Sequence, residues 1–211
     1  MIHILIADDH PFVRRGVKQV LTDEFPGVVV GEASTAPELL DLAGKRQWDL
    51  FVLDLTMPGR SGLDALHELK ACCPDTPVLV LSMHPEDQFA VRVLRAGAAG
   101  YLTKESITEE LVQAVRSILA GGKYIRHSVA DLLATQLQQG DANQPPHARL
   151  SDREFQVLGL IAHGKTVTQI AEELSLSVKS ISTYRARILE KLHLNSTADL
   201  TRYALEHRLI V

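Results

Sequence analysis

Cysteine, aromatic side chains and long apolar runs are all scarce in this chain of 211 residues. The two cysteines, Cys72 and Cys73, are adjacent, so they cannot join distant parts of a fold, and they suit a reducing compartment. No apolar run reaches the roughly 18 residues that a membrane-spanning helix needs. The first residues lack a basic segment and become acidic at Asp8, which argues against a signal peptide. We therefore expect a cytoplasmic protein that does not enter the membrane.

Charge is distributed unevenly along the chain. Residues 1–122 carry 11 lysine and arginine residues and 17 acidic residues, a net charge of −6, whereas residues 148–211 carry 9 and 7, a net charge of +2. Hydrophobic residues make up 45% of the chain, which is enough for folded cores and argues against disorder. The opposite signs indicate two parts with different partners.

The first part alternates short apolar runs with segments of helical periodicity. We expect strands at residues 2–7, 28–31, 50–54, 77–81 and 99–103, each followed by a helix. This alternation predicts an α/β domain with a doubly wound, flavodoxin-like sheet of five parallel strands, covered by helices on both faces. Right-handed crossovers would bring the carboxyl ends of all strands to the same edge of the sheet.

Polar side chains follow the strands at that edge. They are Asp8, Asp9, Asp54, Ser82 and Lys104. Three carboxylates repel one another unless a cation neutralises them, and Mg²⁺ prefers carboxylates completed by water and phosphate oxygens. We expect Asp9 and Asp54 to bind Mg²⁺ directly and Asp8 to act through water. The backbone carbonyl of Thr56 is a further candidate ligand.

Asp54 ends the third apolar run and precedes the turn residues Met57, Pro58 and Gly59. Phosphoryl transfer requires an oxygen nucleophile, a metal and positive groups on the phosphoryl oxygens. Lys104 would supply the positive charge and Ser82 a hydroxyl, so we interpret Asp54 as a phosphoryl acceptor. Taken singly, each residue has a simpler explanation: a helix or turn cap for the aspartates, a turn residue for Ser82 and a solvated surface lysine for Lys104.

The chain changes character after residue 122. Residues 124–139 can form a helix, while residues 140–148 have no apolar period and predict a flexible linker. We place a phosphoacceptor domain at 1–122, a partly helical linker at 123–148 and an all-α domain at 149–211.

The all-α part has the pattern of a helix-turn-helix. Ser151 with Glu154 and Thr166 with Gln169 have the spacing of capping boxes, and two helices flank a tight turn at residues 175–177. The second helix, to about residue 192, would enter the major groove of DNA. The expected base contacts are Lys179, Ser182, Thr183 and Ala186. The expected phosphate contacts are Arg185, Arg187, Lys191 and Thr166. The alternative is a solvated basic helix surface.

These motifs resemble two known families. Asp8-Asp9, the sequence D-L-T-M-P-G at Asp54, Ser82, and G-Y-L-T-K ending at Lys104 resemble a response-regulator receiver domain. The C-terminal segment L-S-D-R-E to I-L-E-K-L resembles a LuxR-type helix-turn-helix. Together they are similar to the NarL/FixJ class of two-component regulators.

The resemblance implies a transcriptional response regulator switched by phosphorylation. A sensor histidine kinase would donate the phosphoryl group to Asp54, Ser82 would move toward it and Tyr101 would follow inward, unless Tyr101 is an ordinary strand aromatic. The phosphorylated protein would form a homodimer on an inverted-repeat site in double-stranded DNA.

Two other hypotheses stay open from the sequence. One is an aspartyl-phosphate enzyme acting on a small phosphorylated substrate. Against it, no second acid stands two residues after Asp54 to act as a general acid, and a DNA-binding domain would be idle. The other is a regulator that binds DNA without phosphorylation; it ranks lower because the set of acidic, hydroxyl and lysine residues is complete.

Overall fold

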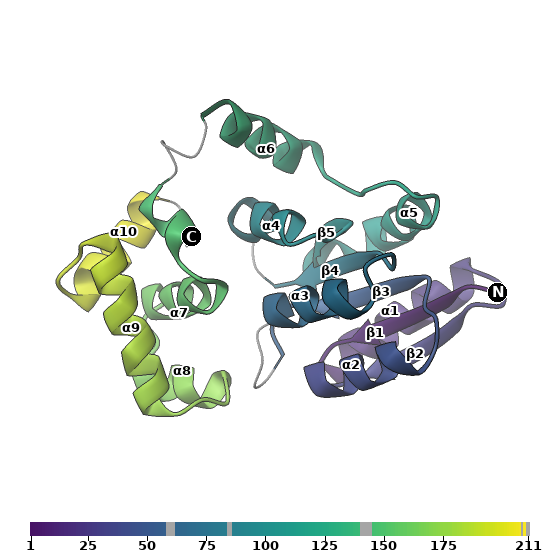
Figure 1. Ribbon diagram of the computed structural model, residues 1–211, viewed down its shortest axis with the longest axis horizontal. Coiled ribbons are helices and arrows are strands. Elements are labelled where there is room, and N and C mark those ends of the chain that lie inside the picture. Colours follow the sequence, from purple (N-terminus) through teal and green to yellow (C-terminus); the bar gives the residue numbers. More distant parts are fainter. Residues whose placement is uncertain (58–61, 84–85, 140–144, 208, 210–211) are drawn as a thin grey trace. The chain divides into compact units, whose positions relative to one another are not determined.

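The computed structural model describes residues 1–57, 62–83, 86–139, 145–207 and 209. The chain forms two compact units, Met1–Thr135 and Gln136–Val211 (Figure 1). Pro58 and Gly59 of the expected turn, and residues 140–144 of the expected linker, lie outside the described residues. In the described part of the chain, no helix combines the length and apolar character needed to cross a membrane.

The first unit is built on a five-stranded sheet of order β2-β1-β3-β4-β5 with all neighbouring strands parallel. The strands are β1 (His3–Ala7), β2 (Val29–Ala33), β3 (Leu50–Asp54), β4 (Val78–Ser82) and β5 (Gly100–Thr103). Every residue of β3 and β4 is buried, which explains why these strands are continuous apolar runs rather than alternating ones. The predicted fold class is confirmed.

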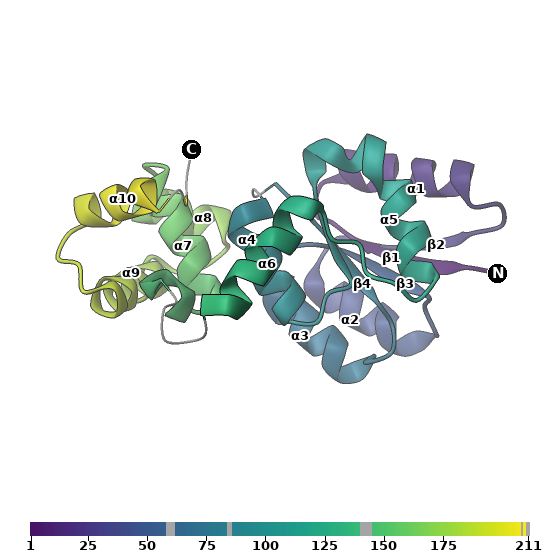
Figure 2. The same ribbon diagram turned by 90° about the horizontal axis from the view of Figure 1, so that it is seen from above.

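Helices cover both faces of this sheet. They are α1 (Pro11–Glu24), α2 (Ala36–Lys45), α3 (Gly62–Cys72), α4 (Glu86–Arg95) and α5 (Ile107–Leu119). Helices α1 and α5 pack together on one face, and α2 and α3 on the other (Figure 2). Pro11 begins α1, where its missing N–H costs nothing. Gly97 and Gly121 follow α4 and α5 with φ of +98° and +86°, as expected for glycines that end helices.

The core beneath α1 and α5 holds the strand ends in place. It contains alternate residues of the strands, such as Ile4 and Ile6 of β1 and Leu50 and Val52 of β3, together with Leu111 of α5. Burying each such side chain contributes roughly 1.5–3 kcal/mol relative to leaving it exposed. The alternation of β3 continues to its last residue, so the packing that orders this strand also fixes the position of Asp54.

The chain after α5 stays with the first unit. The backbone N–H of Tyr124 donates to the carbonyl oxygen of Ala99 at 2.8 Å, and Tyr124 forms an isolated parallel bridge with Gly100 at the edge of β5. Helix α6 (His127–Gln139) follows, with Val129 buried. The compact unit therefore continues to Thr135, and the domain limits of 1–122, 123–148 and 149–211 remain a prediction.

The second unit is helical. A short 3₁₀ turn (Pro146–Arg149) precedes α7 (Asp152–Ala162), α8 (Val167–Glu173), α9 (Val178–Leu192) and α10 (Thr197–Glu206). Each of these four helices is preceded by a residue whose side-chain hydroxyl oxygen accepts a hydrogen bond from the backbone N–H three residues later. These caps are Ser151, Thr166, Ser177 and Ser196. Such a cap is worth about 1 kcal/mol, so the four helix starts are set locally by the sequence.

Helices α8 and α9 form the expected helix-turn-helix. The turn between them contains Ser175 in the left-handed region, with φ of 52°. Ile181, Ile188 and Leu192 of α9 are buried, while Leu189 is only half-buried. The apolar stripe fixes α9 against the rest of the unit and leaves its other face exposed.

Candidate functional site

A buried carboxylate lies at the carboxyl end of the sheet. Asp54 is 1% exposed. Its Oδ2 accepts a hydrogen bond from Lys104 Nζ at 2.8 Å, and its Oδ1 accepts one from the Thr56 backbone N–H at 3.0 Å. Lys104 Nζ is also 2.8 Å from Asp8 Oδ2, so one ammonium bridges two buried carboxylates. Strands β1, β3 and β5, far apart in sequence, deliver these three charges to one place.

Burial and the neighbouring charges shift the pKa values of Asp54 and Lys104. Burial raises the pKa of the Asp54 carboxyl above its ordinary value; the Lys104 ammonium opposes the rise only in part, and the Asp8 carboxylate adds to it. Burial alone would lower the pKa of Lys104, but Asp54 and Asp8 outweigh it and the pKa is raised. Lys104 therefore stays charged, and Asp54 is an acid whose ionised form is stabilised by cations.

Asp8, Asp9 and Asp54 have the geometry of a cation site. These residues and His10 each offer a ligand atom, and the four atoms lie within 4.8 Å of one another. Three carboxylates against the single Lys104 ammonium leave two negative charges, which a divalent cation would balance. Oxygen donors of this kind suit a hard cation. The residues present therefore fit the expected metal.

His10 is a member of the cluster that the sequence did not single out. Its backbone N–H donates to Asp8 Oδ1 at 2.8 Å, and its ring Nδ1 lies 2.7 Å from Asp9 Oδ1. The Asp9 side chain is 26% exposed, which makes it the most accessible of the three acids. The available signal was position alone: His10 directly follows the two aspartates and precedes the Pro11 that begins α1.

Gly62 is the second residue that sequence reasoning missed. Its backbone N–H donates to the Leu55 carbonyl oxygen at 3.0 Å, close behind Asp54. A Cβ at this position would lie 2.3 Å from Leu55 Cα and 2.7 Å from the Asp54 carbonyl oxygen. Only glycine lets the start of α3 approach the end of β3 so closely.

Ser82 and Tyr101 lie on the two strands beyond β3. Leu81 of β4 pairs with Asp54 in the sheet register, so Ser82 is the next residue toward the carboxyl edge. Ser82 is fully buried, and Tyr101 of β5 is 2% exposed. Tyr101 is thus already inside the first unit, and any switching motion of its ring starts from a buried position.

Thr56 contributes to the pocket through its backbone. Its N–H orients Asp54 Oδ1, and its own side chain is partly buried, with Oγ1 lacking a hydrogen-bond partner within the described residues. Its carbonyl remains a predicted ligand.

The exposed face of α9 carries the predicted base contacts. Lys179, Ser182, Thr183 and Ala186 are all exposed. The Thr183 hydroxyl donates back to the Lys179 carbonyl oxygen at 2.9 Å, so this hydroxyl is already bonded within the helix. Among the predicted phosphate contacts, Arg187 is exposed and Arg185 is half-buried. One helix face therefore presents the polar, methyl and cationic groups that reading DNA requires.

Two of the predicted phosphate contacts already have structural roles. Lys191 Nζ donates to Glu154 Oε2 at 2.6 Å, and Glu154 is 2% exposed. Burial would raise the pKa of Glu154, but the hydrogen bonds from Lys191 and the Ser151 N–H outweigh it and lower the pKa. The Thr166 hydroxyl caps α8 and also donates to Gln169 Oε1 at 3.0 Å. A phosphate contact at either residue stays a prediction, and such a contact would have to form in addition to these bonds.

Both halves of the chain match protein-family models. Residues 4–116 match the response regulator receiver domain, and residues 148–204 match the bacterial regulatory proteins of the luxR family.

Two known response regulators are similar to this chain over nearly its whole length. The chain is 40% identical to the response regulator GacA of Pseudomonas aeruginosa over 210 residues, covering 100% of this chain and 98% of GacA. It is 35% identical to the response regulator UvrY of Escherichia coli over 209 residues, covering 99% of this chain and 96% of UvrY.

A solved relative with DNA has the same fold. RcsB of Salmonella enterica serovar Typhimurium, bound to promoter rprA in the presence of the phosphomimetic BeF₃⁻, matches with a TM-score of 0.65 and 29% identity over 96% of this chain and 97% of that one. Another structure shows two RcsB dimers bound to two parallel DNAs, with a TM-score of 0.59 and 29% identity over 96% and 97% of the two chains.

Proposed function

The chain belongs to the two-component response regulators that carry a LuxR-type DNA-binding domain, and we propose that Asp54 is the residue whose phosphorylation switches it. Membership of this family makes it a transcription regulator rather than an enzyme with an external substrate. The observation that carries the assignment of Asp54 is its contact with Lys104, which bridges two buried carboxylates at the carboxyl edge of the sheet.

Phosphoryl transfer to Asp54 follows from its surroundings. A carboxylate oxygen of Asp54 attacks the phosphorus of a phosphohistidine on a sensor histidine kinase, and the phosphorus–nitrogen bond breaks as the acyl phosphate forms. The Thr56 N–H holds one carboxylate oxygen while Lys104 neutralises the other. Once the phosphoryl group is in place, Lys104 can transfer its hydrogen bond to a phosphoryl oxygen.

Mg²⁺ is the cofactor that suits this pocket. When bound, it neutralises charge on the phosphoryl oxygens during transfer. Asp9 and Asp54 would hold it directly, Asp8 through water, and Thr56 through its backbone carbonyl. The residual charge of the three acids and one lysine supports a divalent cation over a monovalent one.

Ser82 and Tyr101 form the proposed switch. Ser82 is fully buried one residue beyond the partner of Asp54 in β4, so a short movement of its hydroxyl would bring it to a phosphoryl oxygen. Tyr101 belongs to the neighbouring strand β5. The displacement of Ser82 would be accommodated around its ring, which changes the surface near α4.

DNA binding is proposed for the exposed face of α9. Lys179, Ser182, Thr183 and Ala186 would contact bases, and Arg185 and Arg187 would contact phosphates, with Lys191 and Thr166 as secondary contacts. RcsB is seen as dimers on DNA, and we propose that phosphorylation likewise favours a homodimer of this chain on an inverted repeat. Binding to chromosomal DNA would place the protein in the cytoplasm.

Site mapping tests the phosphorylation step. Intact-protein and peptide mass spectrometry after incubation with acetyl phosphate should show one added phosphoryl group at Asp54, dependent on Mg²⁺. Asp9→Asn should reduce the yield at least about tenfold, because a direct metal ligand is lost. A phosphoryl group that forms equally well in excess chelator, or at another residue, would contradict the proposal.

A further inference from the structure

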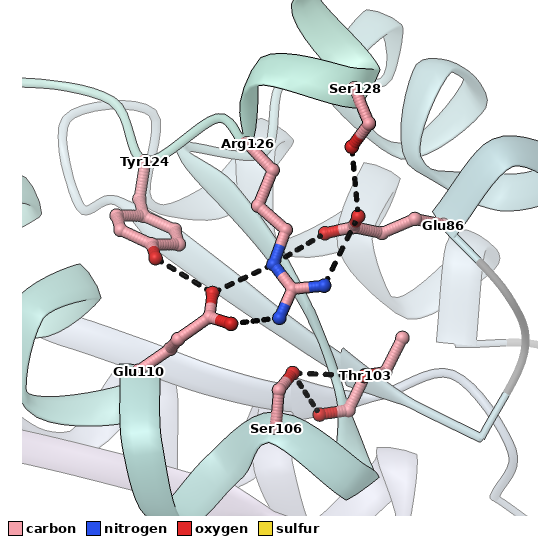
Figure 3. A network of polar contacts seen from close by, with 7 residues as sticks. All are labelled: Glu86, Thr103, Ser106, Glu110, Tyr124, Arg126 and Ser128. Carbon is pink, nitrogen blue, oxygen red and sulfur yellow. Dashed lines mark hydrogen bonds and ion pairs between the residues drawn. The ribbon is translucent and has the colours of Figure 1, made fainter.

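A network of ion pairs ties the segment after α5 to the two helices that follow the proposed switch residues (Figure 3). Its centre is the Arg126 guanidinium. Nε of Arg126 donates to Glu110 Oε2 at 2.7 Å, and a second guanidinium nitrogen contacts Glu110 Oε1. Nε also lies 3.3 Å from Glu86 Oε1, and Nη1 donates to Glu86 Oε2 at 3.4 Å. One cation therefore binds two carboxylates on two different helices.

Two neutral side chains complete the network. The Tyr124 hydroxyl donates to Glu110 Oε2 at 2.7 Å, and the Ser128 hydroxyl donates to Glu86 Oε2 at 3.3 Å. Tyr124 and Arg126 precede α6, and Ser128 lies in its first turn. We call these five residues, Glu86, Glu110, Tyr124, Arg126 and Ser128, the Arg126 clasp.

The clasp is sheltered enough for its charges to matter. The Arg126, Glu86 and Glu110 side chains are 30%, 13% and 20% exposed. Two carboxylates share one guanidinium, so removing Arg126 would leave two partly buried negative charges facing each other. Hydrogen bonds to charged groups contribute more to stability than an exposed ion pair does. Arg126 is therefore the side chain that ties the start of α6 to both α4 and α5.

The position of the two glutamates links the clasp to the phosphorylation pocket. Glu86 begins α4, four residues after Ser82. Glu110 lies in the second turn of α5, six residues after Lys104. Between Lys104 and α5, the Ser106 hydroxyl donates to the Thr103 carbonyl oxygen at 3.1 Å and lies 2.9 Å from the Thr103 hydroxyl (Figure 3). These bonds hold the turn that carries Lys104 against the end of β5.

We propose that the Arg126 clasp is a latch that holds the start of α6 on the unphosphorylated receiver and is loosened when Asp54 is phosphorylated. This inference rests on the function proposed above. Movement of Ser82 toward the phosphoryl group would shift Glu86, which begins α4 four residues later, whereas the bonds between Ser106 and Thr103 hold the turn that leads to Glu110. Arg126 can then no longer reach both carboxylates, and the Glu86 arm, with its longer contacts of 3.3 and 3.4 Å, opens first. The segment leading to the DNA-binding domain gains freedom.

Amide hydrogen exchange in the full-length protein tests the latch without any phosphoryl donor. In Arg126→Gln, the amides of residues 127–134 should exchange about tenfold faster than in the wild type, the factor expected when a charge-assisted hydrogen bond is lost. Exchange in β1 and β3 should not change. Arg116→Gln is the matched control. Arg116 of α5 lies 3.2 Å from Glu24 of α1, and this substitution removes the same charge from the same unit without touching the clasp. Equal exchange of residues 127–134 in Arg126→Gln and wild type would overturn the latch.

The coupling to phosphorylation is measured in the same experiment. Addition of BeF₃⁻ with Mg²⁺ should speed exchange of residues 127–134 in the wild type and leave it unchanged in Arg126→Gln, where the latch is already open. A separate assay shows whether BeF₃⁻ is bound: bound BeF₃⁻ should prevent acetyl phosphate from phosphorylating Asp54. With BeF₃⁻ bound, unchanged exchange in the wild type would overturn the coupling. If BeF₃⁻ does not bind, both the proposed function and the coupling are contradicted. The comparison of wild type with Arg126→Gln in the absence of BeF₃⁻ still decides whether Arg126 holds α6.

Discussion

At the scale of single residues, the acidic pocket around Asp54 contains charges that burial makes costly. Asp54 is buried, with Lys104 bridging it to Asp8, and the pKa of Asp54 is raised because burial outweighs the lysine. Even with Lys104 present, an ionised carboxylate in this position destabilises the fold until a further cation binds. The chain thus maintains an acid that favours the binding of positive charge, which is the property a metal-dependent phosphoryl acceptor needs.

The raised pKa predicts how stability depends on pH. Between the ordinary aspartate pKa of about 3.9 and the raised value, the folded state binds the Asp54 proton more tightly than the unfolded state, so stability falls as pH rises. Asp54→Asn removes this titration. Without divalent cations it should have the higher Tm at about pH 7, by a few degrees, and the difference should close as the pH falls toward about 4. Asp75→Asn, at an exposed loop position, is the control. A lower Tm for Asp54→Asn at neutral pH would contradict this account.

Gly62 is a second residue whose role is purely steric. Gly62→Ala should lower the free energy of unfolding by about 1–3 kcal/mol, because the new methyl group meets the Leu55 backbone rather than a movable side chain. The displaced backbone also carries Asp54, so the rate of phosphorylation by acetyl phosphate should fall. Gly16→Ala in α1, where a Cβ meets nothing within 4 Å, should be neutral or stabilising. Calorimetry of both variants measures the difference, and equal stability would refute the steric argument.

At the scale of helices and strands, local sequence determines much of the architecture. Continuous apolar runs indicated the central strands because both faces of the sheet are covered. The pairs Ser151–Glu154 and Thr166–Gln169 predicted two helix starts that form both bonds of a capping box. The polar residues at the strand ends were also predicted, since parallel topology brings those ends together.

The contacts that the sequence did not reveal join residues far apart in the chain. Arg126 and Glu86 are 40 positions apart, and Lys191 and Glu154 are 37 apart. No periodicity or spacing rule connects such pairs, because they depend on how complete helices pack. Lys191 was accordingly interpreted only as a phosphate contact, although its ammonium also neutralises a buried acid of α7.

The Lys191–Glu154 pair predicts that Lys191 contributes to stability independently of any contact with DNA. Lys191→Met should destabilise the second unit by about 1–3 kcal/mol at neutral pH, since it leaves Glu154 buried without its cation. The pKa of Glu154 is lowered in the folded state, so the stabilisation is present above the ordinary glutamate pKa and is lost as pH falls. The difference between variant and wild type should therefore shrink toward about pH 4. Amide exchange of α7 and α9 in the full chain measures it.

Arg187→Ala is the matched variant for that experiment. Arg187 is exposed on the same helix, so its loss should leave exchange unchanged while weakening DNA binding and reducing its salt dependence. If Lys191→Met were as stable as Arg187→Ala across this pH range, the structural role of Lys191 would be wrong.

At the scale of the whole molecule, an acidic unit that receives a phosphoryl group is joined to a unit that presents a basic helix face. Within the first unit, the Arg126 clasp ties the start of α6 to the helices that follow Ser82 and Lys104. In the proposed latch, phosphorylation of Asp54 would reach the segment that leads to α9 through this clasp. The proposal would account for the presence of both units in one chain, because the phosphoryl group would carry information about DNA binding.

The affinity of one protein preparation for DNA, before and after phosphorylation, tests this central claim most directly. A DNA site is selected with the phosphorylated protein, and its Kd is then measured by fluorescence anisotropy for wild type and Asp54→Asn, each with and without acetyl phosphate and Mg²⁺. The account predicts at least about tenfold tighter binding by the phosphorylated wild type, corresponding to about 1.4 kcal/mol of coupling, and no response in Asp54→Asn. Equal affinity of the phosphorylated and unphosphorylated wild type would contradict it, as would an equal gain in Asp54→Asn.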